Sequence, residues 1–399
     1  MLCKSLPKNS LLALAIFFVC GVASAAVDEE STAPSFRLGG VAVYPGIGVA
    51  WKSDSNIFRY GDANPNKRSS TISVLNPSLL MQADKGAHTY SLTYNADVGR
   101  YSDSPADNYL DQSILGLVEL NLTTRSELTM QPEYIIGHDD RGATYGSATA
   151  DPNIWHSTGL SGSFTYGAEE ARGRVVLDLG YTDYQYQNNR NVTAAYDRKL
   201  SSVGGTFYLR VQPKTSLLVT AKHTAISYQQ IGSVLNSNEQ RLWLGVKWET
   251  TTQTSGELRV GQSQKKFDST LPTYSGGSWE GAVRWSPVTY VNVNLRSSRQ
   301  TNETTLVGSS TILVSNSGVN IGYDLTERVT LRLSGYRSKE DFVGTSRVDH
   351  TDAWGFKAEY QFRSWLIGDV EFTDSIRNSN TPLNDFSRNI FLLSIHSLL

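Results

Sequence analysis

Segments in which apolar and polar residues alternate fill most of this chain, and the connections between them are short and long by turns. A period of two residues is the side-chain period of a β-strand. Short connections lie at 84–86, 123–125 and 212–214, whereas long ones such as 54–69 and 139–154 are rich in Asn, Asp, Ser and Gly, as surface loops are. Short turns at one end and long loops at the other are typical of a bacterial outer-membrane β-barrel.

The pattern predicts one all-β domain, a transmembrane antiparallel β-barrel of about 18 strands, with 16 as the alternative count. With eight short and nine long connections, both termini fall on the short-turn side, which is the periplasmic side in this class. The predicted strands are residues 41–53, 70–84, 86–102, 109–123, 125–138, 155–168, 172–187, 198–212, 214–229, 239–250, 252–267, 277–287, 288–300, 311–324, 327–340, 350–362, 364–376 and 386–399.

The last predicted strand keeps its alternation up to the final residue, with Phe391, Leu393 and Ile395 on one face. A strand in hydrocarbon needs a hydrogen-bonded partner on each side, so we expect this one to close the barrel against residues 41–53. Barrels of this class commonly end in Phe or Trp, which the barrel-assembly machinery recognises, whereas this chain ends in Leu399. We expect that machinery as a partner, together with outer-membrane lipid and lipopolysaccharide, and leave the oligomeric state open.

The N-terminus predicts export. Lys4 and Lys8 precede an apolar run at 11–19, and the small residues Ala23 and Ala25 then mark a cleavage site. The expected organisation is therefore a signal peptide at 1–25, a periplasmic lead-in at 26–40 and the barrel at 41–399, located in the cell outer membrane.

Both cysteines, Cys3 and Cys20, belong to the predicted signal peptide, so the mature chain has none and cannot form disulfides. Val19 precedes Cys20 where lipoprotein sites have a small residue, which argues against lipidation. A closed hydrogen-bonded barrel would supply the stability that disulfides supply to many exported proteins.

Composition excludes several other classes. The formal net charge is -2, which argues against a nucleic-acid partner. Mean hydropathy is -0.31 and no further long apolar run follows the signal, so membrane-spanning helices are not expected. A secreted β-sandwich or β-helix also alternates, but it does not usually sustain such long strands or such regular loop lengths.

Alternation also assigns each side chain to lipid or lumen. In the segment 239–250, Leu242, Leu244 and Val246 oppose Arg241 and Lys247, so the charged side chains would face the lumen. The predicted lumen-facing basic residues are Arg174, Arg210, Lys222, Arg241, Lys247, Arg259, Arg284, Arg296, Arg332 and Lys357. Their acidic counterparts are Asp97, Glu119, Glu133, Asp178, Glu249, Glu257, Glu280, Glu359, Asp369 and Glu371.

These charges have two interpretations. They could form a ladder of basic side chains that guides an anionic substrate along the lumen. The favoured alternative is that they pair with acidic residues across strands, because the two signs are nearly balanced. Aromatic residues in the same region could stack on sugar rings or simply pack the wall, and packing is favoured; they are Trp155, Tyr184, Tyr186, Tyr208 and Trp243.

A His-Asp-Asp run at His138, Asp139 and Asp140 lies beside a long loop. Such residues could serve a hydrolase or ligate a metal, but ordinary loops contain them too and no second histidine can be placed beside them. We therefore predict a protein that is not an enzyme and that has no metal site and no cofactor.

The stretch 54–60, Asp-Ser-Asn-Ile-Phe-Arg-Tyr, follows Tyr-Pro-Gly at 44–46 and precedes Leu-Asn-Pro-Ser at 75–78. With the stretches 94–101, 138–142 and 386–389, it resembles the putative β-barrel porin 2 family. That family includes EpsL-like outer-membrane proteins encoded with exopolysaccharide biosynthesis genes. The resemblance covers most of the mature chain and brings no catalytic residues.

The resemblance implies an outer-membrane barrel that serves exopolysaccharide biosynthesis or secretion, with a polysaccharide and its secretion apparatus as partners. A porin for small solutes is the alternative. A hydrolase acting at the rim through His138, Asp139 and Asp140 is the least favoured interpretation.

Overall fold

The computed structural model describes residues 36–398, apart from 143–148, 169, 250–252, 305 and 307. The predicted signal peptide, most of the lead-in and Leu399 therefore lie outside the described residues. Among the described residues, no helix is long and apolar enough to cross a membrane.

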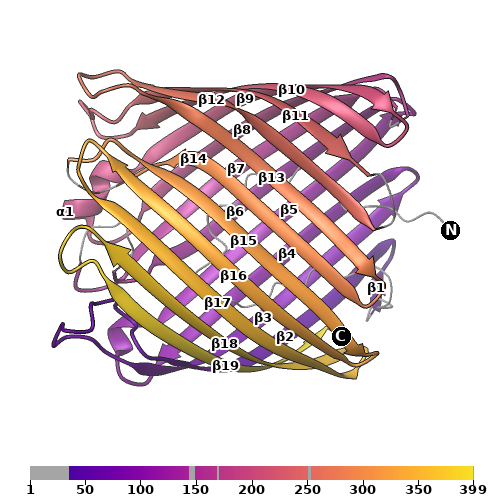
Figure 1. Ribbon diagram of the computed structural model, residues 1–399. Coiled ribbons are helices and arrows are strands. Elements are labelled where there is room, and N and C mark those ends of the chain that lie inside the picture. The colour runs from indigo at the N-terminus through magenta and orange to yellow at the C-terminus, as the bar shows by residue number, and fades with distance from the viewer. Residues whose placement is uncertain are drawn as a thin grey trace.

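Eighteen antiparallel strands, β2 to β19, follow one another around a closed ring (Figure 1). Each strand pairs with its neighbours in sequence, and the ring closes where the last strand meets the first. The strands are β2 (Val41–Asp54), β3 (Ser70–Lys85), β4 (His88–Tyr101), β5 (Tyr109–Thr123), β6 (Ser126–Asp139), β7 (Asn153–Tyr166), β8 (Gly173–Tyr186), β9 (Arg198–Gln212), β10 (Thr215–Tyr228), β11 (Ser237–Trp248), β12 (Thr254–Phe267), β13 (Tyr274–Val288), β14 (Val291–Asn302), β15 (Thr311–Thr326), β16 (Val329–Val343), β17 (Val348–Arg363), β18 (Leu366–Ser379) and β19 (Phe386–Leu398).

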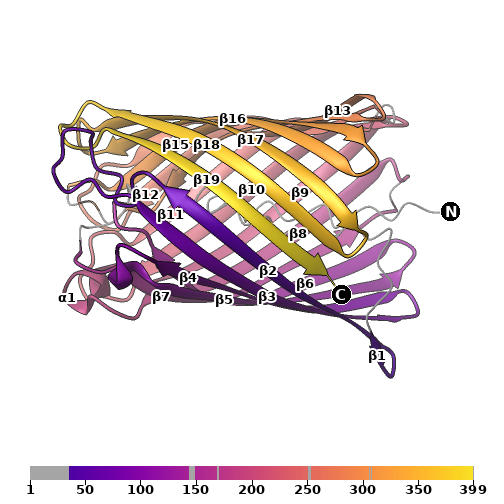
Figure 2. The same cartoon turned by 90° about the horizontal axis from the view of Figure 1, so that it is seen from below.

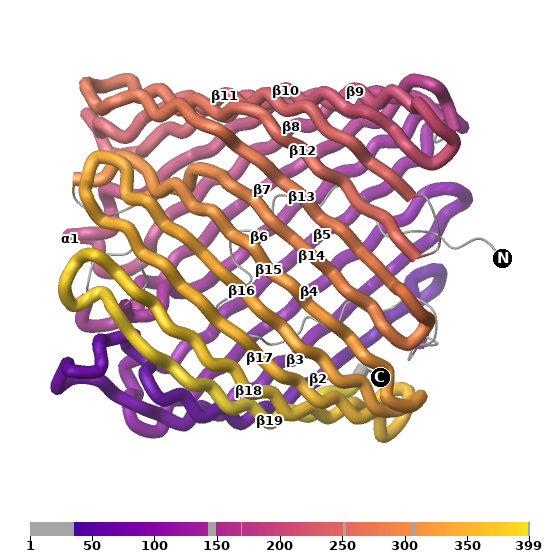
Figure 3. The backbone as a smooth tube through the Cα atoms, viewed as in Figure 1, coloured from indigo at the N-terminus to yellow at the C-terminus, as the bar shows by residue number. Residues whose placement is uncertain are grey.

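The predicted fold class and the count of 18 strands are confirmed, and 16 is wrong. The predicted boundaries differ from the observed ones by three residues or fewer. The tube drawing shows the wall as a single layer of tilted strands (Figure 3). Long loops gather at one end, where the short helices η2 (Pro105–Asp107), α1 (Arg190–Thr193) and η3 (Ala194–Tyr196) also lie.

The closure expected for the last strand is confirmed. β19 pairs antiparallel with β2 in a register that runs from Ile390 opposite Asp54 to Leu398 opposite Gly46. Figure 2 shows the two strands side by side, with the end of β19 at the end of the barrel that carries the short turns. The start of β2 lies at that same end, because β2 runs from it toward the long loops.

A small strand in the lead-in was not predicted. β1 (Phe36–Leu38) turns back at Gly39, whose φ of 59° favours glycine, and pairs with Val41–Val43. The described pairing of β19 with β2 ends at Gly46, so the start of β2 lacks that neighbour there. β1 supplies hydrogen-bond partners for this stretch, which explains its position.

The two faces of the wall differ as the alternation predicts. Outward apolar side chains such as Leu242 and Leu244 are exposed, at 58% and 62%, whereas the inward neighbour Trp243 is 4% exposed. Many outward positions in the half of the barrel nearer the long loops carry polar side chains, such as the Arg337–Asp352 ion pair, although Leu110, Ile154 and Ile376 there are apolar and exposed. The outward apolar side chains are therefore concentrated toward the short turns.

Long loops at the far end turn inward and pack on the wall. In the loop after β2, Asn56, Ile57 and Phe58 are all buried. In the loop after β14, Glu303 forms an ion pair with Lys265 of β12 and accepts a hydrogen bond from Tyr228 of β10. Because β10 is four strands from β14 around the ring, this loop extends over the inner wall.

Truncation of Phe391–Leu399 should abolish assembly of the barrel, because β2 and β18 would then present unpaired edges in hydrocarbon. The measurement is the shift in electrophoretic mobility on heating that marks a folded barrel. Replacing Phe36, Arg37 and Leu38 by serine is the matched control and should leave the shift intact, because the described pairing of β1 is with Val41–Val43 and lies outside the β19–β2 closure. A normal heat shift from the truncated chain would contradict the closed architecture.

Candidate functional site

All ten predicted basic residues lie on the inner face of the wall. The strand registers link them to one another and to buried inward residues such as Thr206, Thr220 and Ser263. The prediction of the inward face is therefore confirmed by the structure. The role of these residues in a substrate path stays a prediction.

Three of the ten pair with an acidic residue two positions away on the same strand, or just beyond its end. Arg241 contacts Glu239 at 2.7 Å, and Arg259 donates to Glu257 at 2.6 Å. Lys247 lies 3.6 Å from Glu249. Residues i and i+2 of a strand share a face, so these pairs are local. The expectation of pairing is thus met, but the prediction that it would run across strands is wrong for these three.

Pairing across strands occurs on β16, β17 and β18. Lys357 lies 3.3 Å from Asp369 on the neighbouring strand and 3.9 Å from Glu359 on its own. Arg332 lies 3.7 Å from the same Glu359. This group resembles the cross-strand pairing that the sequence suggested.

Three more basic residues have other environments. Arg174 lies over the ring of Tyr208 at 4.7 Å, a cation–π contact. Arg210 donates to the carbonyl oxygens of Pro213 and Glu170 near the short turns. Lys222 stands directly opposite Arg241 across the strand pair, and like charges in that position repel.

Arg284 and Arg296 differ from the rest. Both are exposed to the lumen, and their cross-strand neighbours are uncharged. Arg284 is opposite Ser255 and Asn294, and Arg296 is opposite Ala282 and Gly318. Among the described residues, the structure shows no acidic partner bound to either guanidinium.

The opposite side of the ring is acidic. On the inner faces of β3 to β7, which the structure describes completely, acidic side chains occur without any Lys or Arg. Asp97, Glu119 and Glu133 are members of this set. β5 and β14 are nine strands apart in a ring of eighteen, so the acidic wall faces Arg296 across the lumen.

The aromatic residues proposed as sugar platforms are mostly packed into the wall. Trp155, Tyr186, Tyr208 and Trp243 are each no more than 9% exposed. Tyr184 is stacked against Trp155 with ring centroids 4.9 Å apart. Packing, the favoured interpretation, is confirmed for these side chains, because buried rings offer no free face to a sugar.

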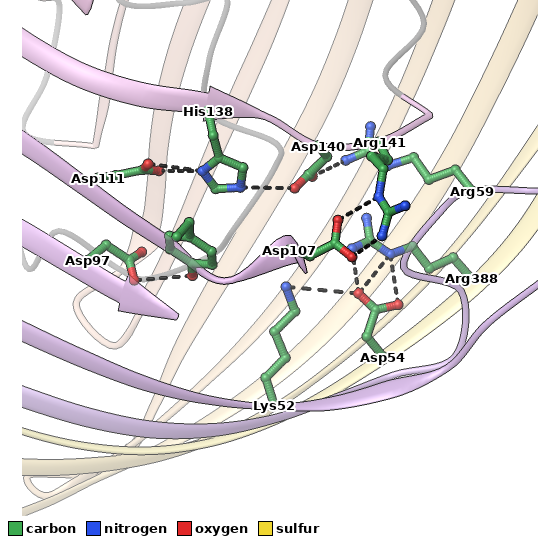
Figure 4. Close-up of polar contacts among 11 residues, drawn as sticks. Lys52, Asp54, Arg59, Asp97, Asp107, Asp111, His138, Asp140, Arg141 and Arg388 are labelled. Atoms are coloured by element: carbon green, nitrogen blue, oxygen red, sulfur yellow. Dashed lines mark hydrogen bonds and ion pairs between the residues drawn. The ribbon is translucent and has the colours of Figure 1, made fainter. Parts of the chain in front are cut away.

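A buried ion pair joins the first and last strands at the rim. Arg388, near the start of β19, donates from Nε to both carboxylate oxygens of Asp54 at 3.0 and 3.1 Å (Figure 4). Lys52 lies 4.0 Å from the same carboxylate. Asp54 is 1% exposed, and an unpaired carboxylate in that position would be costly. The pair therefore fixes the seam of the barrel.

Asn56 ties the following loop to the same seam. Its side-chain amide donates to the carbonyl oxygens of Tyr60 at 2.7 Å and Ser387 at 2.9 Å, and its oxygen accepts from the Tyr60 N–H at 3.0 Å. The side chain is fully buried. These three bonds fold the loop inward onto the start of β19.

The side chains of His138 and Asp140 form contacts that hold the rim together, and they do not form an open hydrolytic centre. His138 Nδ1 contacts Asp111 at 2.9 Å and its Nε2 lies 3.3 Å from Asp140. Asp140 in turn forms an ion pair with Arg59 at 2.6 Å. Both ring nitrogens are thus engaged, and the described residues contain no group of three His, Cys, Asp or Glu that could hold a metal.

Burial alone would raise the pKa of Asp140. The hydrogen bond from His138 and the positive charges of Arg59 and Arg388 instead hold this pKa well below its usual range. Asp140 is therefore charged at every physiological pH, and its contacts persist in mildly acidic solution. They would be lost only as the pH falls through that lowered pKa.

Arg141 and Gly142, which follow the His-Asp-Asp run, contact two neighbouring loops at the rim. Arg141 donates to Asp107 at 2.7 Å, and its guanidinium lies 4.0 Å from the centre of the Phe58 ring. Gly142 has a φ of 80°, and a Cβ at this position would lie 2.0 Å from the Phe58 carbonyl oxygen. Only glycine fits there, because the loops contact each other backbone to backbone.

These contacts bring together three of the sequence stretches that carried the family resemblance. Residues 54–60, 138–142 and 386–389 lie far apart in the chain but meet at one rim (Figure 4). Sequence reasoning found the stretches without their mutual contacts. The complementary charges of Asp54, Arg59, Asp140 and Arg388 were the signal that could have suggested them.

Comparison with known proteins identifies the same family as the sequence resemblance. A family model described as "Putative beta-barrel porin 2" matches residues 33–397. Among curated proteins, a sequence comparison finds no match.

Solved barrels of similar fold have little sequence in common with this chain. OccAB3 of Acinetobacter baumannii aligns with a TM-score of 0.52 and 12% identity, over 91% of this chain and 100% of that one. OccK2 (OpdF) of Pseudomonas aeruginosa in complex with glucuronate gives 0.52 and 12%, over 90% and 98%. OpdK of the same organism with vanillate gives 0.51 and 11%, over 90% and 99%. At these identities the likeness shows the fold alone.

Loss of the seam ion pair should destabilise the barrel. In Arg388→Ala the Asp54 carboxylate stays buried without its main partner, which costs roughly 3–5 kcal/mol. The double variant Asp54→Asn/Arg388→Gln should recover part of that loss, because no charge is left buried alone. Urea unfolding in lipid vesicles measures both variants, and a double variant no more stable than Arg388→Ala would show that the loss does not come from the unpaired Asp54 charge.

Proposed function

Because the chain belongs to the putative β-barrel porin 2 family, we propose that it is an outer-membrane channel for the diffusion of small solutes. One observation carries the proposal: the closed ring of 18 strands has a charged and polar inner wall. Barrels of this size enclose an aqueous path when loops do not fill it. The inward loops after β2 and β14 would then limit the size of the solute.

Two barrels of similar fold were solved with small carboxylates, glucuronate in OccK2 and vanillate in OpdK. These ligands belong to those proteins, but they illustrate what a barrel of this fold can hold. The solute-channel interpretation, which was the alternative at the level of sequence, therefore has more support than the polymer-export interpretation. No observation on the wall specifically favours a polysaccharide.

The expected link to exopolysaccharide secretion stays a prediction. Polymer export that continues unchanged in a deletion strain would count against it. The expected location also stays a prediction: an exported chain with its short turns in the periplasm and lipopolysaccharide around its outer face. The concentration of outward apolar side chains toward the short turns supports that orientation.

Planar bilayers test the channel directly. The folded protein should give stable conductance steps, and neutral sugars should enter protein-containing vesicles at rates that fall with sugar size. Deleting residues 303–310, a loop segment whose Glu303 contacts the inner wall at Tyr228, should raise the size limit. A folded barrel without conductance would overturn the proposal.

A further inference from the structure

Arg284 belongs to a row of polar side chains on the inner wall and Arg296 lies beside it, and charge pairing does not account for this row. Arg284 of β13, Asn294 of β14, and Asn320 of β15 are directly opposite one another in a row across three strands. Ser334 of β16 continues the row. Arg296 lies two residues after Asn294, so it shares the inner face beside that row.

The two guanidinium groups are close together, and among the described residues no acidic side chain is bound to either. Diagonal positions on neighbouring strands are about 7–8 Å apart, and Arg284 and Arg296 occupy such positions. The nearest acidic side chains by register are Glu257, diagonal to Arg284, and Glu280, diagonal to Arg296. Glu257 already accepts a hydrogen bond from Arg259, and one carboxylate oxygen of Glu280 is buried without a hydrogen-bond partner in the described part of the chain. Two neighbouring positive charges repel each other unless an anion lies between them.

Space is available for such an anion. Arg296 stands between Ala282 and Gly318, the smallest side chains available. A Cβ added at Gly318 would meet nothing closer than 3.6 Å. Asn320 is exposed to the lumen, and so are both arginines. The side chains therefore project over an open stretch of wall.

We propose that this row is a binding site for a small hydroxylated carboxylate, such as a sugar acid, on its way through the lumen. Guanidinium groups bind carboxylates through paired, charge-assisted hydrogen bonds. The amides of Asn294 and Asn320 and the hydroxyl of Ser334 supply donors and acceptors for hydroxyl groups. The site deepens the proposed channel function and rests on it for its biological role.

The position of the site within the barrel supports a role in selection. Arg296 lies near the middle of β14, and Glu133 lies near the middle of β6, on the facing acidic wall. An anion is repelled from the acidic wall of β3 to β7 and attracted to the two arginines, so it should approach the lumen wall at Arg284 and Arg296. The attraction is short in range at physiological salt, which favours direct contact with the two arginines.

Binding of D-glucuronate to the folded barrel in detergent, measured by calorimetry, tests the site independently of conductance. The wild-type protein should bind glucuronate more tightly than acetate and should not bind glucose measurably. Arg284→Gln/Arg296→Gln should weaken glucuronate binding roughly tenfold or more. Arg284→Lys/Arg296→Lys should be intermediate, because lysine keeps the charge but loses paired hydrogen bonding.

The matched control is Arg328→Gln/Arg337→Gln, which removes two positive charges outside the lumen: Arg328 lies in a short turn and Arg337 on the outer face. It should bind glucuronate as the wild type does. Equal binding by the Arg284/Arg296 variant would overturn the site, and acetate bound as tightly as glucuronate would overturn the role of the amide row. Conductance without glucuronate binding would refute the site alone, whereas binding without conductance would refute the channel alone.

Discussion

Pairing of the last strand with the first is the constraint on which the rest of the structure depends. Backbone groups in hydrocarbon have no water to bond, so a sheet can cross a membrane only when its two edges meet. Here the edges meet through β19 and β2, and the buried Asp54–Arg388 pair is located where that seam reaches the rim. The same pair lies beside Asn56, so closing the ring also positions the loop that folds into the mouth.

Closure creates an inner wall whose charges are unevenly distributed. Local pairs such as Arg241 with Glu239 neutralise one region, the wall of β3 to β7 is acidic, and Arg284 and Arg296 lie on the opposite side of the ring without a bound acid among the described residues. Paired charges rigidify the wall and contribute little to attraction of a solute. Guanidinium groups without a bound acid remain available to a ligand. We therefore place the proposed substrate site at Arg284 and Arg296 and not at the other eight basic residues.

The strands could be predicted from the sequence because a period of two is a local property. Alternating connection lengths then indicated an up-and-down order of strands. In that order only the first strand was left to pair with the last one, so the pairing of β19 with β2 could be predicted. The rim could not be predicted in this way. Arg388 and Asp54 are 334 positions apart, and only the register of the closed ring brings them together. The inward face of Arg284 was predictable, but its lack of an acidic neighbour depends on which residues oppose it.

The most direct test of the account joins the seam covalently and asks whether the channel still works. Ala50 and Ser394 are directly opposite each other on the inner faces of β2 and β19, and both cysteines of the natural sequence lie within its first 20 residues. In Ala50→Cys/Ser394→Cys, oxidation should form an intramolecular disulfide, and the conductance should be the same before and after oxidation. Failure of the disulfide to form in the folded protein, or loss of conductance when it forms, would contradict a closed barrel with a conducting lumen.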